Sequence, residues 1–255
     1  MNADPIIRLD DVSKAYGAFT VAEHLNLEVR RGEIVALLGQ TGAGKSTILN
    51  MIMGTQPASS GSVRVIGHDP FAEFDKLRGK LAVSFQTDRL LPWRTAVENA
   101  ELGLLILGLS KREARSRAAT WLKRVRLEGA DDKYVHELSG GMKQRVSLAR
   151  ALCVDPELVL LDESFSQLDH VTSQALRRDF AQVVREYHKT CLFVTHRIDD
   201  ALEMADRVIV LAPGAGIALE ETITPENRSD EAWLSRLHDR IADVMGGEEE
   251  DAPSA

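Results

Sequence analysis

The spacing of apolar residues predicts an alternation of strands and one helix in the first third of the chain. Apolar and polar positions alternate over residues 6–12 and 21–29, as expected for strands with one buried face. A continuous apolar run over residues 34–38 predicts a strand that is buried on both faces. Helical spacing follows over residues 45–53, and a further short strand is expected at 63–66.

The middle of the chain has a helical pattern instead. Residues 96–107 and 111–126 are rich in alanine or leucine at helical spacing, and a third helix is predicted over 139–152. No comparable run of alternating positions interrupts them. We therefore expect residues 88–150 to form a helical subdomain inserted into an α/β core.

The alternation of strands and helices then resumes. Strands are predicted at 158–161, 192–194 and 208–211, and helices at 171–187, 198–204 and 231–245. Such an order is typical of a mostly parallel sheet covered by helices, and an antiparallel β part is expected as well. The predicted fold class is α/β. We expect one domain over 1–215 and a C-terminal extension over 216–255 that ends in an acidic tail.

Composition narrows the class of protein. The chain has 255 residues, of which 44% are hydrophobic and 27% charged, values typical of a globular protein. The net charge of -8 opposes non-specific binding to nucleic acid, and 5% aromatic residues argue against a stacking platform for single strands. No stretch approaches the roughly 20 apolar residues that span a bilayer, so a link to a membrane would need a partner. Cys153 and Cys191 lie in apolar sequence and are expected to be buried thiols.

Residues 39–46 match the pattern G-x-x-x-x-G-K-[ST], between a predicted strand and a predicted helix. Glycines at this spacing let backbone N–H groups surround a phosphate chain, and the following helix directs its positive end at the same anion. Lys45 can reach the β- and γ-phosphates, Ser46 can ligate Mg²⁺, and Thr47 can approach the α-phosphate. The candidate phosphate-binding loop comprises Gly39, Gln40, Thr41, Gly42, Ala43, Gly44, Lys45, Ser46 and Thr47. The pattern predicts a P-loop NTPase core; a glycine-rich turn with a chance lysine is the weaker alternative.

Two carboxylates, Asp162 and Glu163, follow the predicted strand at 158–161. In open α/β folds ligands bind at the carboxyl edge of the sheet, where these side chains would lie. Asp162 can hold Mg²⁺, and Glu163 can polarise the water that attacks the γ-phosphate. Paired acids after a strand serve equally often as a helix cap, but the phosphate-binding loop favours the catalytic interpretation.

Ser139, Gly140 and Gly141 predict a second helix N-terminus that is open to an anion. An ordinary capped helix is the alternative interpretation. Residues 138–145, Leu-Ser-Gly-Gly-Met-Lys-Gln-Arg, resemble the signature motif of ABC ATPases. In that family the motif binds the γ-phosphate of the nucleotide held by the opposite subunit.

The resemblance to ABC ATPases covers nearly all of residues 6–212, in the family's order. It implies that Tyr16 stacks on adenine, that Gln86 touches Mg²⁺ and senses the permease, and that His196 contacts the γ-phosphate. It also implies catalysis by Glu163, His196 and Lys45, with ATP and Mg²⁺ bound. Residues 168–169, Leu-Asp, match the loop after the catalytic strand.

Residues 88–99 are similar to the Leu-Leu-Pro-Trp stretch of the importer ATPases for nitrate, sulfonate and taurine. The apolar Leu90, Leu91 and Trp93 could form a groove for a short permease helix, or pack inside the helical subdomain. Four residues depart from that group's usual pattern: Ser164, Ser166, Gln167 and Arg197.

The resemblance implies the ATP-hydrolysing subunit of an importer, peripheral at the cytoplasmic face of the inner membrane. The expected partners are a second ATP-binding subunit, most simply an identical one, a separate permease and, indirectly, an extracytoplasmic solute-binding protein. No nucleic-acid partner is expected. An exporter or lipid transporter, a non-transport ABC ATPase and a regulatory nucleotide-binding module are the alternatives.

Overall fold

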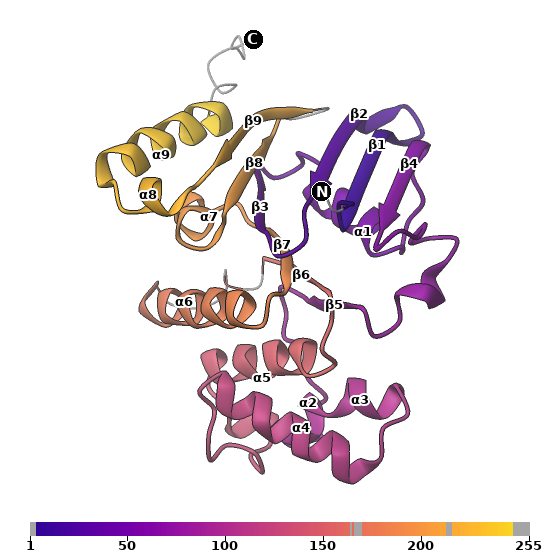
Figure 1. Ribbon diagram of the computed structural model, residues 1–255, viewed down its shortest axis with the longest axis vertical. Helices are drawn as coiled ribbons and strands as arrows, with labels where there is room; N and C mark the ends of the chain where they lie inside the picture. The colour runs from indigo at the N-terminus through magenta and orange to yellow at the C-terminus, as the bar shows by residue number, and fades with distance from the viewer. Residues whose placement is uncertain (1–3, 164, 166–169, 213–215, 247–255) are drawn as a thin grey trace, which may run out of the picture. The chain divides into compact units, whose positions relative to one another are not determined.

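The computed structural model describes residues 4–163, 165, 170–212 and 216–246 (Figure 1). The chain divides into two compact units. The first unit comprises the residues up to Phe74 and those from Leu192 onward, and the second is Asp75–Cys191. The sequence-based domain limits, 1–215, 88–150 and 216–255, stay predictions.

An antiparallel sheet opens the first unit. It contains β1 (Ile7–Tyr16), β2 (Phe19–Val29) and β4 (Ser60–Val65) in the order β2-β1-β4. The two long strands form where alternating positions predicted them. β1 reaches further than expected because Gly17, at φ 61°, closes a two-residue turn that pairs Tyr16 with Phe19. This hairpin therefore carries Tyr16 at its tip.

The first unit also contains a parallel pair of strands, β3 (Ile34–Gly39) and β8 (Arg207–Leu211). Every residue of both strands is buried, as the continuous apolar run at 34–38 predicted for β3. β9 (Ile217–Thr222) pairs with β8 in the antiparallel direction. β9 was not predicted, because its outward face is exposed and its sequence includes two adjacent glutamates.

Helices cover the strands of the first unit. They are α1 (Lys45–Ile52), α7 (Ile198–Met204), α8 (Pro225–Arg228) and α9 (Glu231–Gly246). α9 packs against α7, β8 and β9, as Figure 1 shows in yellow and orange, and buries Leu237 and Ile241. The predicted helices at 45–53, 198–204 and 231–245 are thus confirmed. The segment after residue 216 packs on the same unit as the phosphate-binding loop.

The strands of the second unit are β5 (Leu81–Ser84) and β6 (Leu158–Asp162), which pair in parallel. Ser84 lies opposite Leu161, so the two strands end at the same edge. β5 is only four residues long and was not predicted. β7 (Thr190–Val194) then leads from the second unit into the first.

The described residues of the second unit form five helices: α2 (Ala96–Ala100), α3 (Leu102–Ile106), α4 (Lys111–Arg124), α5 (Gly140–Leu152) and α6 (His170–Glu186). The described residues also form the short 3₁₀ turns η1 (Phe74–Leu77) and η2 (Val135–Glu137). The helix predicted over 96–107 is instead two helices that meet at Glu101. The carboxylate of Glu101 is buried and lies 2.6 Å from the Arg115 side chain of α4, which anchors this junction.

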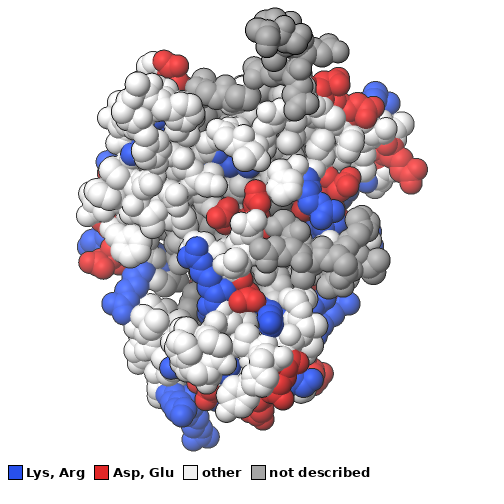
Figure 2. Space-filling model, turned by 180° about the vertical axis from the view of Figure 1, so that it is seen from behind, with Lys and Arg blue, Asp and Glu red and all other residues white. Residues whose placement is uncertain are grey.

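The surface carries both signs of charge. On the described part of the face displayed in Figure 2, Lys and Arg side chains lie among Asp and Glu side chains. Cys153 and Cys191 are buried free thiols, as predicted. Within the described ranges, none of the helices combines the length and the apolar character needed to cross a bilayer.

Candidate functional site

The phosphate-binding loop connects the buried strand β3 to helix α1. Three of its glycines, Gly39, Gly42 and Gly44, have φ angles of 155°, 92° and 85°. L-residues with side chains rarely adopt such angles, so the loop's curvature depends on glycine. Gly44 is also sterically confined, since an added Cβ would lie 2.9 Å from both Cγ1 and O of Val21. Val21 belongs to β2, so the hairpin that carries Tyr16 adjoins the loop.

The N-terminus of α1 is suited to an anion. Its N-cap is Gly44, which offers no side-chain hydrogen bond, and its first turn contains no acidic residue. The backbone N–H groups of that turn therefore have no capping side chain, and the positive end of the helix dipole can face an anionic ligand. Thr41, Gly42 and Ser46 are exposed to solvent, whereas Gln40 and Thr47 are half-buried and Ala43 is buried.

Lys45 lies within the loop itself. Only 6% of the residue is exposed, and its Nζ donates hydrogen bonds of 2.7 Å to the carbonyl oxygens of Gly39 and Gln40. These bonds hold the ammonium group inside the curve of the loop, where phosphate oxygens would arrive. The side chain of Gln40 also donates a hydrogen bond to the Met245 carbonyl, so the end of α9 contacts the loop.

We expect Gly44→Ala to lower the free energy of unfolding by about 1–3 kcal/mol, because the new methyl group would combine a strained φ with a clash against Val21. Gly42→Ala is the matched control, since Gly42 also has a positive φ but an added Cβ there would meet nothing within 4 Å. Urea denaturation monitored by circular dichroism measures both. Equal losses for the two variants would contradict the steric role of Gly44.

Tyr16 is 46% exposed at the tip of the β1–β2 hairpin. Its hydroxyl donates a hydrogen bond to Gln56 Oε1, and Lys14 Nζ lies 5.1 Å from the centre of its ring. The hydroxyl bond fixes the ring direction, while nearly half of the side chain stays open to a flat ligand. Phe19, its partner across the strands, is 64% exposed.

His196 follows β7, in the first unit, and is exposed. The backbone before it is fixed by a hydrogen bond of 3.2 Å from Thr195 N to the Leu37 carbonyl of β3. The Thr195 hydroxyl accepts from Arg197 N at 3.0 Å, and the Arg197 side chain lies 3.7 Å from the Asp200 carboxylate. Arg197, one of the departures from the importer pattern, therefore has a local role in holding this turn.

In the second unit, the structure brings Gln86 and Glu163 together. Gln86 Nε2 donates a hydrogen bond of 3.2 Å to Glu163 Oε2. The contact arises because β5 and β6 end at one edge, with Gln86 two residues after β5 and Glu163 directly after Asp162, the last residue of β6. Glu163 has φ 45°, an uncommon angle for a side-chain-bearing residue and one that is concentrated at functional sites.

The signature segment begins helix α5. Ser139 is the N-cap, and its side chain accepts a hydrogen bond of 3.4 Å from Met142 N. Ser139 and Gly140 are exposed, Gly141 is half-buried, and the first turn of α5 contains no acidic residue. This N-terminus is thus also open to an anion.

The Leu-Leu-Pro-Trp segment precedes helix α2. Leu90 is buried, Leu91 is half-buried and Trp93 is 70% exposed. Asn99, to which the sequence motifs assign no role, holds this segment: its side chain accepts from Leu91 N at 2.7 Å and donates to the carbonyls of Leu91, Arg94 and Thr95.

Several predicted features fall beyond what the structure describes. Ser164, Ser166, Gln167 and residues 168–169 lie outside the described residues. Of the remaining candidates, the phosphate-binding loop, Tyr16 and His196 belong to the first unit, and Gln86, Asp162, Glu163 and the signature segment to the second.

A strand, a glycine-rich loop with a buried lysine and an uncapped helix define the class of P-loop nucleotide-binding proteins. Comparison with known proteins specifies the family. The family model described as ABC transporter matches residues 22–166. The bicarbonate transport ATP-binding protein CmpD of Synechococcus elongatus is 39% identical over 227 residues, which cover 87% of this chain and 80% of that protein.

The taurine import ATP-binding protein TauB of Escherichia coli O157:H7 is also 39% identical, over 84% of this chain and 83% of its own length. A solved dimeric ATP-binding cassette in a post-hydrolysis state, bound to ADP and Pi, superposes with a TM-score of 0.74 at 32% identity. That match covers 86% of this chain and 99% of the cassette. The chain belongs to the ABC transporter family, within which it is an ATP-binding ATPase, as the sequence motifs predicted.

Proposed function

We propose that this chain hydrolyses ATP to energise solute import through a separate permease, in the nitrate, sulfonate and taurine group of importers. The functions of its relatives, bicarbonate transport and taurine import, support transport of a small hydrophilic solute, and the taurine relative supports the inward direction. The observation that carries the nucleotide chemistry is the loop of residues 39–47, with Lys45 held inside it and an open helix end behind it.

Each residue of the loop has a distinct role in the proposal. Backbone N–H groups at the start of α1 bind the phosphate oxygens, and Lys45 exchanges its bonds to Gly39 and Gln40 for bonds to the β- and γ-phosphates. Tyr16 stacks on the adenine. Thr47 approaches the α-phosphate, and the other loop residues contribute backbone groups.

The proposed metal is Mg²⁺, which prefers oxygen ligands. The Ser46 hydroxyl, the Asp162 carboxylate and the Gln86 amide oxygen have the chemistry it requires. When bound, the ion would neutralise charge on the β- and γ-phosphate oxygens. The exposed Ser46 and the half-buried Asp162 are both accessible to it.

Glu163 is the proposed general base. A carboxylate polarises the attacking water, and the hydrogen bond from Gln86 orients that carboxylate. Gln86 therefore links the hydrolytic residue to the segment that leads to Trp93. His196 is proposed to contact the γ-phosphate, with its position set by Thr195 and Arg197.

Two copies of the chain are proposed to complete each other's sites. The N-terminus of α5, with Ser139, Gly140 and Gly141, would bind the γ-phosphate of ATP held by the partner subunit. The open end of that helix and the dimeric state of the similar cassette support this arrangement. ATP binding would close the dimer and hydrolysis would reopen it.

The permease is proposed to dock on the segment with Leu90, Leu91 and Trp93. Trp93 is a large exposed aromatic side chain on a segment that Asn99 holds in place, which are properties of interface anchors. This partner would keep the chain at the cytoplasmic face of the inner membrane, and an extracytoplasmic solute-binding protein would act through the permease.

We expect Leu91→Asp with Trp93→Asp to weaken permease binding by at least 30-fold, because two apolar anchors would become charged, at a cost of about 2 kcal/mol or more. Co-purification from cells that co-express the tagged permease measures the effect. Trp93→Asp alone, at a position that is 70% exposed, shows whether the loss depends on folding.

Ile106→Asp is the matched control, since Ile106 is an apolar residue of the same unit with 59% exposure. ATP hydrolysis by the isolated variants should stay near the wild-type rate. Normal recovery of the permease with the double variant would contradict the docking segment, and equal losses for Ile106→Asp would show that the effect is unspecific.

A further inference from the structure

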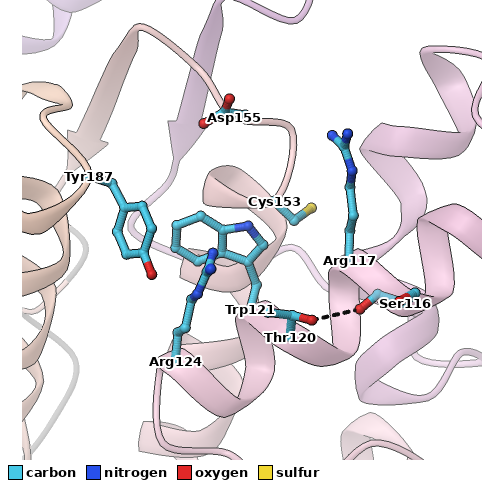
Figure 3. Close-up of a pocket in the computed structure, with 8 residues that line it drawn as sticks. All are labelled: Ser116, Arg117, Thr120, Trp121, Arg124, Cys153, Asp155 and Tyr187. Atoms are coloured by element: carbon cyan, nitrogen blue, oxygen red, sulfur yellow. Dashed lines mark hydrogen bonds between the residues drawn. The ribbon is translucent and has the colours of Figure 1, made fainter.

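A surface cavity of about 330 Å³ lies within the second unit, and none of the residues assigned above lines it. It is bounded by α4 from Ser116 onward and by residues that follow α5 and α6 (Figure 3). Its lining residues are Ser116, Arg117, Thr120, Trp121, Arg124, Cys153, Asp155 and Tyr187. All of them belong to one compact unit, so the cavity is a property of that unit.

Arg124 is held in the cavity by two aromatic rings. Its guanidinium carbon lies 4.7 Å from the centre of the Trp121 ring and 4.4 Å from that of Tyr187. The centres of the two rings are 5.1 Å apart, and Trp121 is only 5% exposed, so the packing of Trp121 fixes the position of this ring pair. A guanidinium that stacks through its faces keeps its N–H edges for acceptors. Arg124 is therefore oriented in advance for an oxyanion.

Arg117 supplies a second positive charge, two helical turns before Arg124 on the same face of α4. Among the described residues, neither arginine has a salt bridge, whereas other arginines of α4 and α5 do, such as Arg115 with Glu101. The one carboxylate in the lining, Asp155, lies 2.6 Å from Lys189 Nζ, which offsets its charge. The lining as a whole is thus positive.

Two of the remaining groups also favour a ligand with acceptor atoms. The Thr120 hydroxyl is not one of them, because it already donates its proton to the Ser116 carbonyl at 2.9 Å, the dashed line in Figure 3. The Ser116 and Tyr187 hydroxyl groups make no hydrogen bond with a described residue and can donate. Burial raises the pKa of the Cys153 thiol to about 12, so this sulfur stays uncharged and does not repel an anion.

We propose that this cavity binds a small organic oxyanion, whose carboxylate or phosphate group accepts hydrogen bonds from Arg117 and Arg124. Charge-assisted bonds of this kind are about twice as strong as neutral ones, and a guanidinium edge matches two oxygens at once. The volume is that of a small-molecule site and about ten times the roughly 30 Å³ share of one water, so it fits a metabolite rather than a bare ion.

The test is a binding titration that reports from inside the cavity. In the Trp93→Phe, Trp233→Phe background, Trp121 is the remaining tryptophan, because the chain has three. Citrate, glycerol 3-phosphate and inorganic phosphate are the probes. We expect citrate or glycerol 3-phosphate to change Trp121 fluorescence in a saturable way at millimolar concentration or below, and inorganic phosphate to bind at least tenfold more weakly.

Arg117→Gln should reduce the affinity at least tenfold and leave the Arg124 stacking intact, so its folding is not at issue. Arg112→Gln, at an exposed arginine of the same helix that does not line the cavity, is the matched control and should bind normally. Absence of saturable binding by both organic probes, full affinity in Arg117→Gln, or equal binding of inorganic phosphate would each overturn the proposal. The assay involves no ATP hydrolysis, so its outcome is independent of the proposed transport function.

Discussion

Glu163→Gln is expected to lower the rate of ATP hydrolysis by about 10²–10⁴-fold while ATP binding persists. The amide has the shape of the carboxylate but cannot take up a proton from the attacking water. It can still accept the hydrogen bond from Gln86, so the local structure should be kept. Steady-state phosphate release measures the rate, and equilibrium binding of radiolabelled ATP measures the affinity.

The same variant should accumulate as an ATP-bound dimer, because the step that reopens the dimer is blocked. Size-exclusion chromatography with and without ATP reports this. Glu128→Gln, at an exposed glutamate of the second unit that pairs with Lys123, is the matched control and should turn over normally. Near-normal hydrolysis by Glu163→Gln would show that another group activates the water.

Most elements of the fold could be predicted because their periodicity is strong. The buried strand β3 reads as a continuous apolar run, and α7 and α9 have helical spacing with apolar residues such as Leu237 and Ile241 facing inward. These patterns depend on residues close in sequence. The phosphate-binding loop could also be predicted from the sequence, since the local φ angles require its glycines.

The sequence could not predict features that depend on distant contacts. β9 forms because β8 offers a free edge, and its own sequence, with adjacent glutamates, has little strand character. The junction between α2 and α3 depends on the pairing of Glu101 with Arg115, fourteen residues later. The pattern of apolar residues also could not predict the positive φ of Glu163 or the several hydrogen bonds of Asn99.

In the candidate site, too, the sequence predicted the residue types but not the contacts between distant residues. The residue types of Lys45, Asp162 and Glu163 indicated their chemistry, but not that Lys45 would be held by two carbonyl oxygens of its own loop. The Gln86–Glu163 hydrogen bond requires the parallel pairing of β5 with β6, and β5 was itself not predicted. The cavity at Trp121 joins residues of α4 with residues that follow α5 and α6, and has no sequence motif.

The central claim, that each nucleotide site is completed by a second subunit, is tested most directly by mixing two inactive variants. Lys45→Ala removes the phosphate contact within one subunit, and Ser139→Arg obstructs the helix end that would face the partner's nucleotide. Each variant alone should lose at least 99% of its ATPase activity, since oxyanion stabilisation of this kind is worth about 10²–10³-fold.

In a mixed dimer of these variants, one site combines both defects and the other has neither. ATPase activity should therefore return when differently tagged Lys45→Ala and Ser139→Arg subunits are co-expressed and the mixed dimer is isolated through both tags. Recovery of up to half the wild-type rate per dimer is the predicted result. A mixed dimer that forms but stays as inactive as its parents, or a Ser139→Arg protein that hydrolyses ATP normally as a monomer, would contradict the claim.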